Sequence, residues 1–395
     1  MVPASVDDRA EAPEAPVATA RDQKSPTNQQ PTKKEWGFEW ADHPSLYVGK
    51  NTRIDFRARV QADVRDSEAS IGDTSGFDVA RKRVGVEGRV AGIIDFQIER
   101  ELDGSDPWRD VYVDYRQFAY AEVQAGKFKL PFSLDETTSS TNLDFVYRSR
   151  AATQLAPGRD HGAMVHGRVL KGKLHYELGL FDHDGKNART NNPDRVFGGT
   201  TVAGRVTMQP FRRQKTAVRD LQFGVAFTHS DVPTGYSSLR GRTALDASFF
   251  PSDVWVQGQR RRVGLEVRWR PGSFSVKSEY IRVTTERLGQ SVEDMDLSPV
   301  LATGWYVSGT WAITGEAKAD GLDHPRHPIL RGGYGAIELA MRVEGLAFGS
   351  TASNDLPSAS PRADVIRGNS DRVSTFGVNW RLRDRRTYRC GISHA

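Results

Sequence analysis

The sequence predicts an all-β chain that folds as a transmembrane antiparallel β-barrel. Segments of about ten residues that alternate apolar and charged side chains recur along the chain, and a strand of ~10 residues crosses a bilayer when it is tilted. The expected connections are alternately short and long, as in outer-membrane barrels. No apolar run approaches the ~20 residues of a membrane-spanning helix, which excludes a helical membrane protein.

The clearest predicted strand is 53–63, RIDFRARVQAD. Ile54 and Phe56 fall on one face, and Arg57 and Arg59 fall on the other, because successive side chains of a strand point to opposite sides. A soluble β-sandwich also alternates, but its polar face rarely carries so many arginines. The same pattern predicts further strands near 79–88, 92–100, 110–117, 121–128, 162–170, 173–181, 199–208, 220–229, 262–270, 273–283, 303–313, 337–348 and 373–382.

The connections between these strands separate into two kinds. Tight turns are expected at Lys171-Gly172 and Pro271-Gly272. One connection breaks the alternation, because residues 314–334 are long where a short turn is expected. Either that turn is unusual or the strand count slips there. Long loops are expected at 129–160, 182–198, 230–260, 284–302 and 349–370.

The N-terminal segment, residues 1–34, is expected to be disordered. It is rich in Ala, Pro, Asp, Glu and Gln and has no aromatic residue, so it cannot bury enough apolar surface to offset its ordering entropy. It has no apolar stretch of the secretory type. The protein therefore either stays inside the cell or has a natural start upstream of the given one.

No catalytic or metal-binding motif stands out. Cys390 is the single cysteine of the sequence, which excludes an intrachain disulfide framework and a multi-cysteine metal site. His324 and His327 lie in DHPRHP, which reads as a surface loop because no further ligands accompany them. The arginines alternate with apolar residues along the predicted strands and form no basic cluster before 381–395, where most of the net charge of +5 lies. Nucleic-acid binding is therefore not expected. We expect no enzyme activity, no cofactor and no metal.

The polar faces of the strands would all point into one lumen. A guanidinium group stays charged at working pH and offers forked donors that match phosphate oxygens. Fast passage of an anion requires several binding sites of moderate affinity along the pore. The residues therefore indicate an anion-conducting pore. The alternative is that each arginine pairs with an acid and only stiffens the wall. The arginines expected in the lumen are Arg57, Arg59, Arg81, Arg83, Arg168, Arg205, Arg268 and Arg342.

Four pieces of the sequence resemble the phosphate-selective porin O and P family: GKFKLPF (126–132), TSS (138–140), LDFVYRS (143–149) and LAPGRDHG (155–162). The resemblance covers roughly 36–382. It implies a homotrimer of sixteen-stranded barrels among the lipids of a Gram-negative outer membrane. It also implies a third loop folded into the lumen, where it forms a constriction that binds phosphate or polyphosphate. Weaker matches are RVGVEG (83–88), RDVYVDY (109–115), ITGE (313–316) and FGVNW (376–380).

On this resemblance the inward loop is about 129–160, and the chain passes phosphate or other small anions by passive diffusion. The loop would bring Ser139, Ser140 and Arg148 towards the narrow zone, with Lys127 and Lys129 at its base. Arg59, Arg81 and Arg83 would form the opposing wall, and Asp110 would be the acid that orients those bases. Glu136 departs from this picture, because it puts a negative charge close to the anion site.

The C-terminal tail departs most from the family pattern. The barrel domain is expected over 35–382, and residues 383–395 show no alternation, which is typical of a frameshift or truncation. The predicted strands number about 14, so two strands, a closing hairpin, would be missing from sixteen. A barrel without that hairpin exposes unpaired backbone to lipid. The chain is therefore expected to close and insert poorly.

Other readings stay open at this point. The chain could be a general anion-preferring porin without phosphate specificity, or a truncated, non-functional copy. From another class, it could be a soluble β-sandwich that binds acidic polysaccharide. An outer-membrane hydrolase would need a lumen-facing pair such as Ser149 with His161 or His166, although no motif supports one.

Overall fold

A computed structural model describes residues 36–40, 43–66, 76–104, 107–185, 200–232, 256–291, 293–318, 325–350, 369–383 and 386–394. The segment expected to be disordered, 1–34, and His324 lie outside these residues. No helix among the residues described has the length and apolar character needed to cross a membrane.

The described chain is almost entirely β-structure, with two short helices and one 3-10 turn. The helices are α1 (Leu134–Thr137) and α2 (Arg150–Leu155), and the 3-10 turn is η2 (Ile329–Arg331). The strands are β1 (Trp36–Trp40), β2 (Pro44–Val48), β3 (Thr52–Arg65), β4 (Gly76–Val90), β5 (Ile94–Glu101), β6 (Trp108–Phe118), β7 (Ala121–Lys129), β8 (Arg159–Val169), β9 (Leu174–Phe181), β10 (Thr201–Met208), β11 (Gln222–Val232), β12 (Gly258–Trp269), β13 (Phe274–Arg287), β14 (Leu297–Ala312), β15 (Ala336–Ser350), β16 (Asn369–Arg383) and β17 (Arg386–His394).

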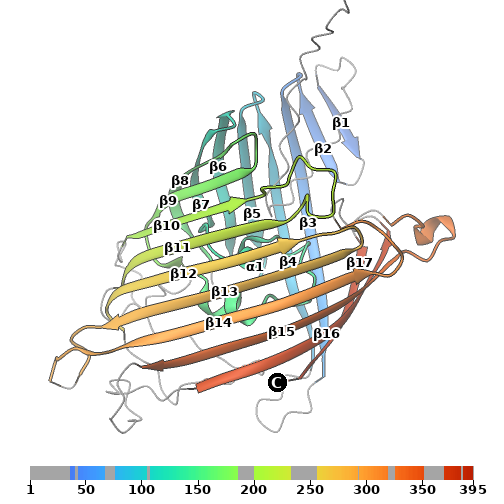
Figure 1. Ribbon diagram of the computed structural model, residues 1–395. Helices are drawn as coiled ribbons and strands as arrows, with labels where there is room; N and C mark the ends of the chain where they lie inside the picture. Colours follow the sequence, from blue (N-terminus) through green and yellow to red (C-terminus); the bar gives the residue numbers. More distant parts are fainter. Residues whose placement is uncertain are drawn as a thin grey trace, which may run out of the picture.

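All of these strands belong to one sheet, in which each strand pairs antiparallel with the next along the chain. Figure 1 shows the sheet bent round on itself, with β3–β7 behind and β11–β16 in front. Every strand expected from the alternation is present, and β1, β2 and β17 are additional. The fold class is therefore confirmed as one large antiparallel sheet.

The tail is the clearest correction to the strand prediction. Residues 386–394 form β17, which pairs with β16 in a register that sets Cys390 opposite Val378. The sequence showed no alternation there, because an edge strand is held by backbone hydrogen bonds to its neighbour and needs no regular apolar face for that. The expected count of about 14 strands is correspondingly too low.

The long connection at 314–334 is an unusual turn and not a slip in the count. It joins β14 and β15, which pair directly with each other. Its first residues fold inward, and the side chains of Glu316 and Lys318 are buried. Because these first residues pack inside the sheet, the connection is longer than a simple turn requires.

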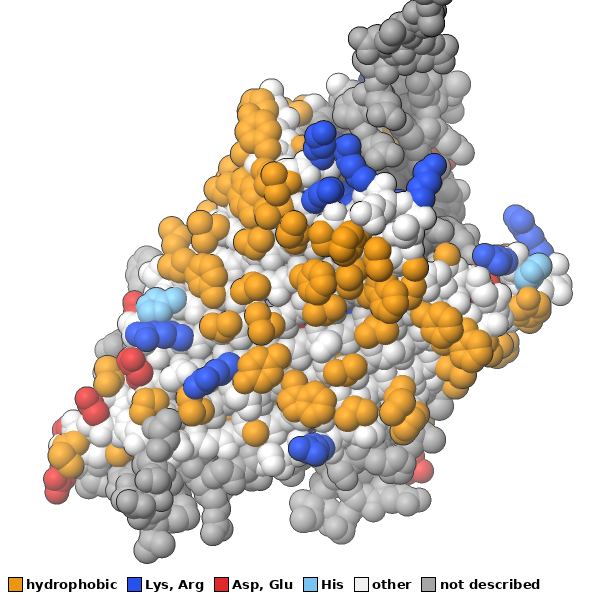
Figure 2. Space-filling view, viewed as in Figure 1, with side chains coloured by type: hydrophobic (Ala, Val, Ile, Leu, Met, Phe, Trp, Pro, Cys, Tyr) orange, Lys and Arg blue, Asp and Glu red, His pale blue; other side chains and the backbone are white. Residues whose placement is uncertain are grey.

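The two faces of the sheet have opposite character. On the outside, apolar side chains such as Val60 and Leu178 are exposed, at 76% and 53%. Figure 2 shows such side chains spread over the outer face of β10–β16. Aromatic residues lie near the turn end, where Phe274 of β13 stacks on Trp311 of β14. An apolar outer band with aromatic borders suits lipid contact, and it rules out the soluble sandwich, whose apolar faces would be buried.

Candidate pore constriction and anion site

The segment 130–158, between β7 and β8, turns into the space that the sheet surrounds. A backbone hydrogen bond of 2.9 Å from Leu130 to Gly158 closes its base. Phe132, Ala151 and Leu155 pack with residues of the opposite wall in one apolar cluster. A Cβ added at Gly304 of β14 would lie 2.9 Å from Ala151 Cβ, so α2 rests directly on the wall there. We call this segment the inner loop.

Carboxylates of that wall hold the two helices of the inner loop. Glu279 of β13 accepts hydrogen bonds from the backbone N–H groups of Leu134 and Asp135, at 3.1 and 3.4 Å, where α1 begins. Glu344 of β15 accepts one from Arg150 N–H at 2.6 Å, where α2 begins. The first N–H groups of a helix have no partner within the helix, so an acid there is stabilising. These acids therefore anchor the loop.

Deeper in the lumen, Asp144 at the tip of the inner loop meets two lysines. Its carboxylate lies 2.7 Å from Lys277 Nζ of β13 and 3.2 Å from Lys318 Nζ of the 314–334 connection. Asn379 of β16 donates a hydrogen bond of 2.8 Å to the Asp144 carbonyl oxygen. Burial alone would raise the pKa of Asp144, but the two lysines outweigh it and hold that pKa well below its usual range.

A second buried group of ion pairs lies outside the inner loop. Asp184, in the connection that follows β9, pairs with Arg262 at 2.5 Å and Arg260 at 2.7 Å. Burial would raise the pKa of Asp184, but these two arginines of β12 lower it to about 2. Both carboxylates therefore stay charged well into the acid range, and their ion pairs persist there.

The far side of the inner loop reaches β3. Arg59 Nη1 donates a hydrogen bond of 2.5 Å to Ser140 Oγ, and the Tyr147 hydroxyl donates one of 3.3 Å to Asp63 Oδ2. The Tyr147 carbonyl oxygen meanwhile accepts a bond of 3.1 Å from Arg342 of β15. One loop residue thus contacts strands near both edges of the sheet, so the sheet wraps around the loop and the loop narrows the lumen.

Two arginines on this wall are free of acidic partners. Among the residues described, Arg59 and Arg81 have no carboxylate within ion-pair distance; Arg59 contacts Ser140, and Arg81 donates to Gln61. Arg81 lies within electrostatic range of Arg59, Arg83 and Arg148. Arg59 and Arg81, with the Ser140 hydroxyl beside Arg59, thus place two guanidinium ions without an acidic partner among the described residues, an arrangement that suits an oxyanion.

Other predicted lumen arginines are paired with acids, as the structural alternative expected. Arg57 pairs with Glu87, and Arg83 lies 2.6 Å from Glu101 and 3.1 Å from Glu99. Arg268, by contrast, donates to the Gln222 amide oxygen at 2.6 Å. The arginines paired with acids are the wall-stiffening ones and differ in this from Arg59 and Arg81, whereas Arg268, like Arg81, has an amide oxygen as its partner. Arg205 pairs with Glu177 and Glu266, and Arg342 pairs with Glu344.

Arg148 and Lys129 hold the backbone of the inner loop. Arg148 donates to the carbonyl oxygens of Asp135 and Thr138, the latter at 2.7 Å. Lys129 donates to the carbonyl oxygens of Glu136 and Thr138, at 2.5 and 3.2 Å. Ser139, next to Ser140, lies 2.9 Å from the Thr141 hydroxyl. Lys129 thus lies at the base of the loop, and both side chains place amine or guanidinium groups on the side of the loop that carries Ser140.

The structure corrects two of the predicted roles. Asp110 forms a forked ion pair with Arg159, at 2.7 and 3.2 Å, and the acids that orient Arg83 are Glu99 and Glu101 of β5. The alternation of 96–101, FQIERE, already set these glutamates on one face. Lys127 is directed outward, because its cross-strand neighbours are Val111 and His161, and the His161 side chain is 62% exposed.

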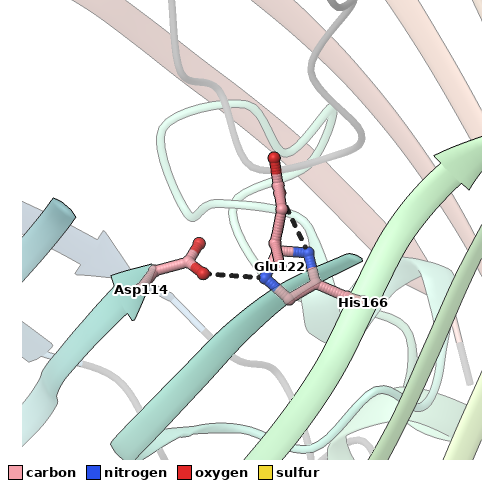
Figure 3. A group of neighbouring side chains, drawn as sticks. All are labelled: Asp114, Glu122 and His166. Atoms are coloured by element: carbon pink, nitrogen blue, oxygen red, sulfur yellow. Dashed lines mark hydrogen bonds and ion pairs between the residues drawn. The ribbon is translucent and has the colours of Figure 1, made fainter. Parts of the chain in front are cut away.

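A second charged cluster, formed by Asp114, Glu122 and His166, ties β6, β7 and β8 together (Figure 3). His166 Nε2 lies 3.0 Å from Asp114, His166 Nδ1 lies 3.3 Å from Glu122, and Arg116 lies 3.2 Å from Glu122. Both ring nitrogens are thus engaged and a cation is already in place, so the cluster works as an ion-pair network. Ser149, 0% exposed, caps α2 by accepting from Ala152 N–H, so the pairing of Ser149 with His166 is not formed.

The outer apolar band, the charged interior and the narrowing loop together define an outer-membrane channel of the porin class. A family model described as phosphate-selective porin O and P matches residues 54–385, and the chain belongs to this family, as the sequence resemblance indicated. Members are channels and not enzymes, so this chain is an outer-membrane channel of a phosphate-selective family.

Solved structures agree on the fold. The chain is similar to OmpT, an outer membrane protein of Vibrio cholerae, with 11% identity, a TM-score of 0.53, and coverage of 87% of this chain and 86% of that one. It is also similar to OprB of Pseudomonas putida, with 9% identity, a TM-score of 0.51, and coverage of 86% and 87%. A comparison with curated protein sequences finds no match.

Proposed function

We propose that the chain closes into a sixteen-stranded barrel, assembles as a homotrimer and passes anions, phosphate or polyphosphate among them, by passive diffusion. The wrapped sheet supports closure, since β3 and β16 both contact the inner loop. Because every consecutive pair is antiparallel, β17 runs parallel to β1 and antiparallel to β2. Strands β2–β17 number sixteen, the even count that allows antiparallel closure. Closure of this kind requires β17 to take the edge of β2 that β1 now occupies.

Cys390, the single cysteine, lies in β17 and provides a direct test of closure. Cysteines placed one at a time through 44–48 should include a position that forms a disulfide with Cys390 on mild oxidation, because closed neighbours bring Cα atoms within ~7 Å. A cysteine at Leu178, in β9, is the matched control and should form none. Closure is contradicted if no position in 44–48 cross-links and the protein migrates identically on a gel before and after heating.

The observation that carries the proposed function is the pair of arginines without acidic partners. The acids of the β13–β15 wall hold the inner loop, whereas Arg59 and Arg81 have, in the described part of the chain, a hydroxyl and an amide as their hydrogen-bond acceptors. The anion path therefore runs between the inner loop and β3–β4. Ser140 and Ser139 supply hydroxyl donors there, and Arg148 and Lys129 supply charge from the loop side. Arg57 and Arg83 contribute a rigid basic wall.

Phosphate block of chloride current in a planar bilayer tests this assignment. Millimolar phosphate should block the wild-type channel. In the Arg59→Gln/Arg81→Gln variant the half-blocking concentration should rise at least about tenfold, because hydrogen bonds from charged donors contribute ~1.5–3 kcal/mol each. Arg213→Gln, at an exposed arginine in the connection between β10 and β11, is the control and should change it little. Anion selectivity without any phosphate block would favour the general anion porin.

A further inference from the structure

Asp63 is a carboxylate where the proposed path would be expected to carry none. It follows Gln61 on the inward face of β3 and lies within electrostatic range of Arg81. Its Oδ1 accepts a hydrogen bond of 3.0 Å from the Gln61 amide, whose oxygen in turn accepts from Arg81. Its Oδ2 accepts from the Tyr147 hydroxyl of the inner loop. A negative charge at this place repels every anion that approaches Arg81.

The partners of Asp63 distinguish it from the other acids of this wall. Glu99 and Glu101 are neutralised by Arg83, and Glu87 by Arg57. Asp63, among the residues described, receives hydrogen bonds only from neutral donors. No ion pair among these residues therefore satisfies it, and two donors leave part of the accepting capacity of a carboxylate unused. A further donor brought by a ligand fits the site, and a further acceptor does not.

This chemistry separates oxyanions by whether they carry a proton. Hydrogen phosphate retains a P–OH group that donates to a carboxylate, whereas sulfate at the same charge has none. We propose that Asp63 selects proton-bearing oxyanions, phosphate above sulfate, at the site formed with Arg59 and Arg81. The inference rests on the proposed function and names its substrate class. Sulfate would leave the Asp63 repulsion uncompensated, which is how a site rejects a close analogue.

The test compares block of chloride current by phosphate and by sulfate at about pH 8.5, where phosphate is mostly a dianion like sulfate. In the wild type, phosphate should half-block at a concentration at least about tenfold lower than sulfate, the factor given by one hydrogen bond to a charged acceptor. In the Asp63→Asn variant, the half-blocking concentrations of phosphate and sulfate should differ by no more than about threefold, chiefly because sulfate blocks more tightly. Asp55→Asn is the matched control, since Asp55 lies on the same face of β3 but pairs with Arg53.

A second measurement needs no variant. Arsenate carries an As–OH group and selenate carries none, so arsenate should block like phosphate and selenate like sulfate. The role of Asp63 is overturned, and the anion path left intact, if the four anions block according to their size instead. The same holds if the ratio of the phosphate and sulfate half-blocking concentrations is unchanged in a folded Asp63→Asn channel. A wild-type channel that phosphate fails to block overturns the proposed function and this inference together.

Discussion

Replacing Arg59 and Arg81 together with glutamate is expected to convert the channel from anion-selective to cation-selective. Among the residues described, these are the two arginines of the β3–β4 wall that have no carboxylate within ion-pair distance. The double substitution places two acids beside Asp63, so the narrowest part of the path becomes negative. Charged rings at a constriction set the sign of ion selectivity because the field is strongest where water is least. The reversal potential under a KCl gradient should change sign.

The matched control applies the same change in charge outside the lumen. Arg213 and Lys215 are exposed in the connection between β10 and β11, and the Arg213→Glu/Lys215→Glu variant should keep anion selectivity. Both variants must show heat-modifiable migration, the sign of a closed barrel. If the two double variants shift the reversal potential equally, total charge sets selectivity, and the path assigned between the inner loop and β3–β4 is wrong.

Asp144→Ala is expected to release the inner loop. The change leaves Lys277 with no carboxylate at its amine and Lys318 with Glu338 alone among the described contacts. Breaking a buried ion pair by removing one partner costs about 3–5 kcal/mol, much of which would appear as loosening of the loop. Single-channel conductance should rise several-fold and phosphate block should weaken. Asp103→Ala, which removes an exposed partner of Lys82, should leave both unchanged.

The pKa of Asp144 also predicts how this anchor responds to acid. A carboxylate whose pKa is lowered on folding stabilises the fold above its unfolded value, near ~3.9, and loses that effect only as the pH falls through the folded value. The pKa of Asp144 lies well below the usual range and that of Asp184 is about 2. Wild-type conductance should therefore be stable down to about pH 4. A step increase in conductance above that pH would show that the ion pairs of Asp144 do not by themselves keep the loop in place.

The strands were predictable because they depend on a local pattern. Apolar side chains such as Leu265 and Val60 recur at every second position and face outward, opposite charged ones, so a single strand carries the signal. The tail, residues 386–394, lacks that pattern and was missed. This segment forms a strand because it pairs with β16, and that pairing cannot be read from the sequence of the tail itself.

The site was predictable by face but not by partner. The alternation placed Arg59, Arg81 and Arg83 inside, yet it could not distinguish paired from unpaired arginines. That distinction depends on sheet register, which brings Glu101 to Arg83 and Asp110 to Arg159. The residues that anchor the inner loop could not be predicted from the sequence for the same reason. Asp144 and Lys318 lie 174 residues apart in sequence, and only the folding of the inner loop against the wall brings them together.

The most direct test of the central claim is the reversal potential of the unmodified channel in a planar bilayer under a KCl gradient. The claim is that uncompensated arginines between the inner loop and β3–β4 line the conducting path. Properly folded wild-type protein should show a chloride-selective reversal potential, and adding phosphate should reduce the current. A potassium-selective potential from folded protein would contradict the claim outright.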